Sequence, residues 1–329
     1  MNDLYLNCWL LALITLALFL ACLLGSTSLP LDVVTQALLG RGDPREVAVV
    51  WEIRLPRGVA AVLVGASLGV SGAALQGLLR NPLAEPGILG VSATAALAAT
   101  TVIYYGLATI SPLVVPISAI LGALLAVATI AFAAFRALSV VGLILLGVGI
   151  SSFAGAVMSL LLNFAPHPFS LADMVNWTLG SVANRSFEDL ILVLPFSVVG
   201  VALLWSARRG LSALTLGEEA AQGMGLNLSR QRVLVIVGAG FLTGSAVAVA
   251  GAIGFVGIVA PHLVRPWVSF DASRTLLPSG LLAGLILLLA DIFIRLLPTG
   301  VELKLGVVAA LLGAPIFVWI AMRRGARSV

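Results

Sequence analysis

The stretch that decides the fold is GVAAVLVGASLGVSGAALQGLL, residues 58–79, which holds 22 uncharged residues between Arg57 and Arg80. As a helix rising about 1.5 Å per residue, it is long enough to cross a hydrocarbon core about 30 Å thick. Gly65, Gly69 and Ala73 recur every four residues, so these small residues share one helix face and let a neighbouring helix approach closely. The stretch predicts a transmembrane helix.

The composition extends this prediction to the whole chain. Hydrophobic residues make up 60% of the 329 residues and charged residues only 10%. A soluble domain carries about 25% charged residues, so this chain has too few to cover a surface exposed to water. Aromatic residues amount to 7%, and nothing indicates the aromatic girdles and alternating strands of an outer-membrane barrel. We therefore expect an all-α integral membrane protein with a single transmembrane domain over 1–329.

Charged residues and turn signals divide the chain into about ten predicted spans. No basic residue precedes Arg41, so the first apolar stretch is expected to be a retained span and not a cleaved signal peptide. Cys8 and Cys22 both lie in that stretch, as apolar filler. The predicted spans are 4–31, 58–79, two between Glu85 and Arg136 with a turn at Ser111-Pro112, 138–162, 190–207, one full and one short re-entrant span in 233–264, 275–290 and 305–322.

The basic residues set the expected orientation. Ten spans place both termini on one side of the membrane. If that side is the cytoplasm, 11 of the 18 basic residues lie inside and seven outside, as the positive-inside rule requires. The net charge of +4 then reflects topology, and no nucleic-acid partner is expected. Both termini are therefore predicted to be cytoplasmic.

The chain shows no energy source of its own. A phosphate-binding P-loop needs a lysine followed by Ser or Thr, whereas the only lysine, Lys304, precedes Leu305. Ion coupling usually relies on acidic residues within spans. The deepest acid, Asp291, stands four residues before Arg295, a spacing that predicts an ion pair on one helix face. An ion-coupled secondary transporter is the alternative, and an intramembrane enzyme is disfavoured because catalytic side chains do not cluster.

Several motifs carry a family resemblance. They are WEIRLPR at 51–57, GAALQ at 72–76, NPLAEPGILG at 81–90, GAIGFVG at 251–257, Pro261-His262, and GAPIF at 313–317. The chain resembles the permease family of type II ABC importers, which carry cobalamin, haem and ferric siderophores. The resemblance covers nearly the whole chain.

The resemblance implies a location in the bacterial inner membrane and a set of partners. It implies ten helices per subunit, a homodimer whose interface forms the pathway, two ATPase subunits inside and a periplasmic substrate-binding protein outside. ATP and Mg would be used by the ATPase subunits, and this chain itself would bind no cofactor or metal and catalyse no covalent chemistry. Which metal chelate is carried does not follow from these motifs.

The resemblance also implies three groups of site residues. Arg54, Arg57 and Arg295 would dock the binding protein, and guanidinium groups suit carboxylates because they bind them through two parallel hydrogen bonds. A coupling loop at about 208–230 would contact the ATPase through a helix that starts after Gly217, has acids in its first turn and ends at a glycine. Its expected members are Leu216, Gly217, Glu218, Glu219, Ala221, Met224 and Gly225, and the expected inner gate is Asn81, Leu83, Ser139 and Val140.

Three features qualify the resemblance. Ser92 is followed by Ala93-Thr94 where family members often have a glycine, which bears on the packing of the third span. Gly223 costs the coupling helix about 1 kcal/mol relative to alanine, so a short helix is expected. His167 lies in a predicted outer loop, where contact with a haem-like ligand is the alternative to an ordinary solvated histidine.

Overall fold

The computed structural model describes residues 3–25, 27, 29–136, 138–298 and 302–325, and the regular elements among these residues are all helices. Seven helices are long and apolar enough to cross a membrane. The helices are α1 (Asp3–Leu23), α2 (Leu31–Leu38), α3 (Pro44–Ala48), α4 (Leu55–Leu78), α5 (Val91–Tyr104), α6 (Val114–Phe135), α7 (Val140–Asn163), α8 (Pro168–Thr178), α9 (Phe187–Leu214), α10 (Glu218–Gly223), α11 (Leu228–Ala250), α12 (Val256–Val264), α13 (Ala272–Leu296) and α14 (Leu305–Gly325).

The predicted all-α membrane architecture is confirmed, whereas the number of spans stays a prediction. The seven long helices match seven of the expected spans, with α3 and a π-helical turn at Val49–Arg54 extending α4 outward. The turn at Ser111-Pro112 separates α5 from α6. α5 and residues Leu305–Ile316 are shorter apolar helices, and α12 has nine residues.

α4 is the central helix, and its small residues explain why. It packs against α13, α11, α12 and α9. A Cβ added at Gly65 would lie 2.4 Å from the carbonyl oxygen of Ala283, and one at Gly69 would lie 2.4 Å from that of Ser279. Because only a glycine allows such backbone contact, the four-residue spacing read from the sequence is a close-packing face.

The expected full span plus short span in 233–264 is a broken helix. α11 ends at Gly251, whose φ is +70°, and α12 begins after Phe255, whose φ is +66°. The extended segment between them brings the start of α12 against the middle of α4, since the backbone of Gly257 meets that of Leu68 and Gly72. The eighth predicted span is therefore a half-length helix that starts inside the bundle.

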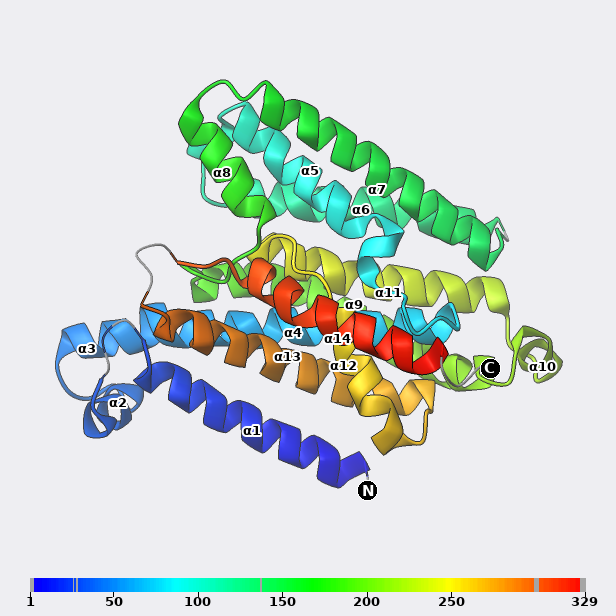
Figure 1. The fold of residues 1–329 in the computed structure, drawn as a ribbon, viewed down its shortest axis with the longest axis horizontal. Helices are drawn as coiled ribbons and strands as arrows, with labels where there is room; N and C mark the ends of the chain where they lie inside the picture. The colour runs from blue at the N-terminus through cyan, green and yellow to red at the C-terminus, as the bar shows by residue number, and fades with distance from the viewer. Residues whose placement is uncertain (1–2, 26, 28, 137, 299–301, 326–329) are drawn as a thin grey trace.

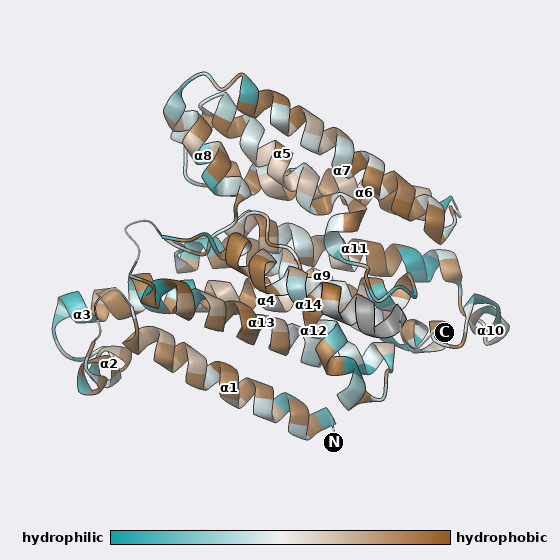
Figure 2. Ribbon diagram, viewed as in Figure 1, coloured by the Kyte–Doolittle hydropathy of each residue, from teal (hydrophilic) through white to brown (hydrophobic). Residues whose placement is uncertain are grey.

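The helices run roughly along one long axis, with polar residues gathered at the two ends (Figures 1 and 2). α2 and α3 lie at one end, which we call the α2–α3 end. α10 lies at the opposite end, called the α10 end, and both chain termini point toward it (Figure 1). α5, α6, α7 and α8 form a layer beside the group built around α4. By the predicted orientation, the α10 end is cytoplasmic.

Candidate coupling and docking sites

The expected coupling helix is present as α10, a helix of six residues. It begins after Gly217, whose φ of +106° suits glycine, and Glu218 and Glu219 occupy its first turn. It ends before Gly225, which also has a positive φ, and Leu226 closes the turn by donating its N–H to the carbonyl of Ala221. Ala221 is buried and fixes the helix to the bundle. The predicted start, end and short length are confirmed, whereas contact with an ATPase stays a prediction.

The surface of α10 combines acids with apolar side chains. Leu216 is 68% exposed and Met224 is 59% exposed on either side of the helix, and Glu219 is exposed between them. α10 projects beyond the ends of the long helices (Figure 1). Exposed apolar side chains on a projecting loop are typical of a surface that a partner covers.

Arg232, near the start of α11, joins α10 to the loop before α7. Its Nη2 donates to Oε1 of Glu218 at 2.8 Å, and its Nη1 donates to the carbonyl oxygen of Leu138 at 3.2 Å. Arg232 is 8% exposed. From the sequence, Arg232 is predicted only to be one of the basic residues on the inner side, because its partners stand 14 and 94 residues away.

The four predicted gate residues lie in two places at the α10 end: Asn81 and Leu83 in the loop after α4, and Ser139 and Val140 at the start of α7. The side chain of Asn81 accepts the N–H of Leu83 at 2.9 Å, and Leu83 is exposed. Ser139 caps α7 by accepting the N–H of Gly142, and Val140 packs partly against the core. A cavity of about 220 Å³ touches Arg80, Pro82 and Thr215, which brings the loop of Asn81 beside the end of α9. A gating role stays a prediction.

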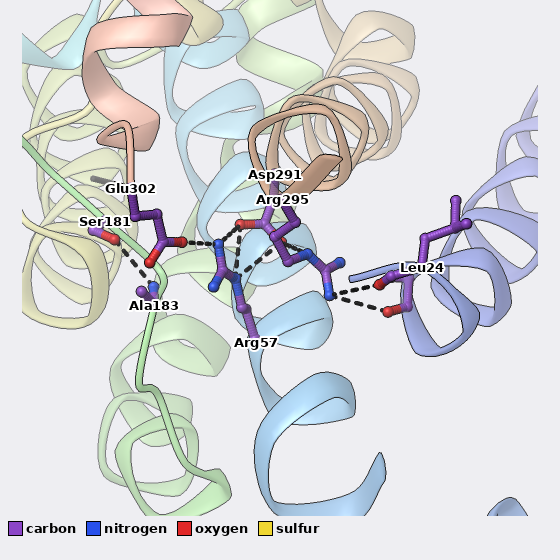
Figure 3. A network of polar contacts seen from close by, with 8 residues as sticks. Leu24, Arg57, Ser181, Ala183, Asp291, Arg295 and Glu302 are labelled. Atoms are coloured by element: carbon purple, nitrogen blue, oxygen red, sulfur yellow. Dashed lines mark hydrogen bonds and ion pairs between the residues drawn. The ribbon is translucent and has the colours of Figure 1, made fainter. Parts of the chain in front are cut away.

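At the α2–α3 end, one buried carboxylate holds two arginines (Figure 3). Asp291 is fully buried. Its Oδ1 accepts hydrogen bonds from Nε and Nη2 of Arg57 at 2.9 and 2.8 Å, and its Oδ2 lies 3.1 Å from Nε of Arg295. Arg57 also pairs with the half-exposed Glu302, and Arg295 donates to the carbonyl of Ala21 at 3.0 Å. This cluster joins α4, α13, α1 and the segment before α14.

Arg54, which is predicted to dock the binding protein, lies buried against the end of α1. It is 5% exposed and points at the end of α1, where it donates to the carbonyl oxygens of Cys22, Leu23 and Thr27. The last carbonyls of a helix lack partners within the helix, and the guanidinium supplies them. The three arginines predicted to dock therefore lie at one end of the molecule, and each already has partners within the chain. Docking stays a prediction.

An acid from the loop after α4 lies against the break between α11 and α12. Glu85 accepts the backbone N–H of Phe255 at 3.4 Å, and it lines a cavity of about 160 Å³ together with Ser92, Gly254 and Gly257. The NPLAEPG motif and the GAIGFVG motif, 170 residues apart, thus meet at this break.

Metal-ligating residues do not gather in the described part of the chain, where no group of three His, Cys, Asp or Glu side chains could hold an ion. His167 is exposed and precedes α8 without making a capping bond through its side chain. The structure leaves contact between His167 and a ligand as a prediction.

Comparison with known proteins agrees with this architecture over its full length. Residues 12–323 match the FecCD transport family. An ABC transporter permease protein of Bacillus subtilis, YvrB, whose function is uncharacterised, is 38% identical over 96% of this chain and 93% of its own. The vitamin B12 import system permease protein BtuC of Klebsiella pneumoniae is 39% identical over 84% of this chain and 83% of its own.

The fold has a solved counterpart. A metal-chelate type ABC transporter described in an inward-facing conformation superposes with a TM-score of 0.85 at 30% identity, covering 98% of this chain and 99% of that one. The protein is thus a multi-pass permease subunit of an ABC importer of the bacterial inner membrane. It belongs to the FecCD transport family.

Proposed function

We propose that this chain forms half of a homodimeric pathway that imports a metal chelate, namely a ferric siderophore, haem or cobalamin. Two ATPase subunits, using ATP and Mg, would drive it from the cytoplasm, and a periplasmic binding protein would deliver the substrate. Both termini would be cytoplasmic. The chain itself would bind no cofactor and carry out no chemical step.

The observation that carries this proposal is the surface of α10. It projects at the end toward which both termini point (Figure 1), and its exposed Leu216 and Met224 flank two acids. Burial of such exposed apolar side chains against a partner protein lowers the free energy of the complex. An ATPase subunit fits this surface because the chain has no P-loop of its own.

The homodimer is supported by the open face of α7. Val141, Leu145 and Val148 are exposed along it, and a Cβ added at Gly149 or Gly155 would meet no atom within 4 Å. Small residues on an open face within the membrane favour the close approach of another helix. We propose that α7 of a second copy covers this face or that the two copies line the pathway with it.

The proposed docking role divides among the three arginines. Arg57 pairs with Glu302, whose side chain is 43% exposed, so a carboxylate of the binding protein can exchange with Glu302. Arg54 and Arg295 bond to carbonyls at the end of α1 and would support Arg57 from behind. We expect the matched variants Glu302→Gln and Arg57→Gln to change docking affinity in opposite directions.

The substrate class is supported by the relatives, one of which is named for vitamin B12 import and another for metal-chelate transport. Uptake by proteoliposomes tests it. The chain would be reconstituted with its ATPase and binding protein and offered labelled cyanocobalamin, haem and a ferric siderophore separately. ATP-dependent uptake of one of them supports the proposal. Uptake that survives ATP depletion and stops with a protonophore would instead identify an ion-coupled transporter.

A further inference from the structure

Two segments that would move in the proposed mechanism, α10 and the start of α7, are both linked to the side chain of Arg232. Arg232 bonds at once to Glu218, the first residue of α10, and to the carbonyl of Leu138. Leu138 directly precedes Ser139, the residue that caps α7. One path from the coupling helix to the start of a predicted gate helix therefore runs through the guanidinium of Arg232.

The planar guanidinium of Arg232 holds its two hydrogen bonds at a fixed angle to each other. Its five donors have a rigid geometry, and a hydrogen bond to a carboxylate is charge-assisted and stronger than a neutral one. The side chain of Arg232 is 10% exposed and that of Glu218 is 37% exposed, so water screens the pair only in part. A displacement of α10 at Glu218 should therefore displace Leu138 as well.

The helix that carries Arg232 is itself anchored. The neighbouring Gln231 is buried, and its side chain donates to the carbonyl of Ala207 on α9 at 2.8 Å. A Cβ added at Gly210 would collide with that same side chain. Because α11 is held in this way against α9, the backbone of Arg232 stays in place while its side chain bonds to α10 and to the residue before α7.

We propose that Arg232 is a positioning residue that couples nucleotide-driven motion of α10 to the inner end of α7. The inference rests on the proposed function and adds to it the specific contact that transmits the displacement of α10 to α7. Arg232 touches neither substrate nor nucleotide in this role. Its loss should uncouple the gate from the ATPase without preventing the ATPase from binding.

The test uses the chain assembled with its ATPase subunits. Val141 is exposed near the start of α7 and is replaced by cysteine in a background carrying Cys8→Ser and Cys22→Ala. The rate at which a water-soluble maleimide labels Val141→Cys is measured without nucleotide and after trapping with ATP and vanadate. Binding of the ATPase and its hydrolysis rate are measured in the same samples.

With the native Arg232, trapping should change the labelling rate. In Arg232→Gln, that nucleotide-dependent change should fall about tenfold, because a charge-assisted bond is lost, while ATPase binding and hydrolysis stay near the native level. Arg230→Gln is the matched control, since Arg230 is an exposed neighbour on the same helix, and it should keep the native response.

A charge swap separates the two bonds. Glu218→Arg with Arg232→Glu restores an ion pair, but a carboxylate at 232 cannot donate to the carbonyl of Leu138, so the response should stay lost. Full response in Arg232→Gln, or full rescue by the swap, would overturn the proposal. Absence of ATPase binding by the native chain would instead refute the proposed function.

Discussion

The two ends of the molecule are fastened in different ways. At the α2–α3 end, Asp291 is fully buried and holds Arg57 and Arg295, and Arg54 and Arg295 add bonds to the end of α1. At the α10 end, the half-exposed Glu218 pairs with Arg232. The cluster around Asp291 is a network with several partners for each charge, whereas α10 is bonded to the loop before α7 through the side chain of Arg232.

This difference indicates where motion is costly. Breaking a buried pair leaves an uncompensated charge away from water, which costs several kcal/mol. Breaking the pair of Glu218 with Arg232 costs less, because water reaches the half-exposed carboxylate of Glu218 and replaces its lost partner. The α2–α3 end therefore resists rearrangement more strongly than the α10 end does. A transporter driven from one side needs that asymmetry.

The largest effect is expected at Asp291. Asp291→Ala leaves the guanidinium groups of Arg57 and Arg295 without their carboxylate and should lower the free energy of unfolding by roughly 3–5 kcal/mol. Thermal unfolding in detergent measures the change. Glu302→Gln is the control, since its side chain is 43% exposed, and it should unfold within a few degrees of the native protein. Native stability of Asp291→Ala would contradict the contrast between the ends.

The packing of α4 against α12, which lies between the two ends, is tested at Gly72. Gly72→Ala places a methyl group 1.9 Å from the carbonyl oxygen of Gly257, so α4 and α12 must separate, and overpacking of this kind costs about 1–3 kcal/mol. Gly77→Ala, on the same helix, has its nearest neighbour at 3.1 Å and should cost less. Equal unfolding temperatures for the two variants would show that the middle of the bundle yields more easily than we infer.

A pH effect of about 1 kcal/mol is expected at Asp271, which caps α13 near the α10 end. Although burial opposes it, hydrogen bonds from Arg274, Ser273 and Ser212 hold the pKa of Asp271 below its ordinary value. A lowered pKa gives stability that is present above about pH 3.9 and is lost as pH falls through the folded-state pKa.

The measurement compares unfolding temperatures of the native protein and Asp271→Asn at pH 7 and near pH 3. The native protein should be more stable at pH 7, by about 1 kcal/mol for a cap and its side-chain bonds, and the difference should shrink in acid. Ser212→Ala removes one donor and should give an intermediate result. A difference that grows toward low pH would reverse the sign that we assign.

The smallest effect is expected within α10. A Cβ added at Gly223 meets nothing within 4 Å, so Gly223→Ala should stabilise the end of this helix by about 1 kcal/mol. Slower amide hydrogen exchange at Met224 and Leu226 would register the change, with global unfolding hardly altered. Exchange that is unchanged or faster would mean that the helix end is set by its contacts and not by propensity.

Local spacing predicted the part of the outer cluster that lies on one helix. Asp291 and Arg295 pair as their separation of four residues indicated. Arg57 joins them from 234 residues away, which spacing within a helix cannot reveal. For this reason, reversing Arg54, Arg57 and Arg295 together would disturb the fold as well as docking, and a change at Arg57 with Glu302 is the cleaner test.

The inner sites show the same division. Gly217, the acids after it and Gly225 specify α10 through local backbone and dipole preferences, and the structure confirms that helix. The contacts of Arg232 with Glu218 and Leu138 depend on how α11 lies against two other segments, so no sequence motif predicts them.

Taken alone, the sequence determined that this chain lies in a membrane, where its long helices are and which small residues pack. Hydrophobic length, charge content and glycine spacing are properties of contiguous residues, and lipid converts them directly into helices. Only the tertiary structure decided which charges are buried and which partners they have, because those pairings depend on the crossing of helices far apart in the chain. The closed cluster at Asp291 and the bridge at Arg232 are both of this second kind.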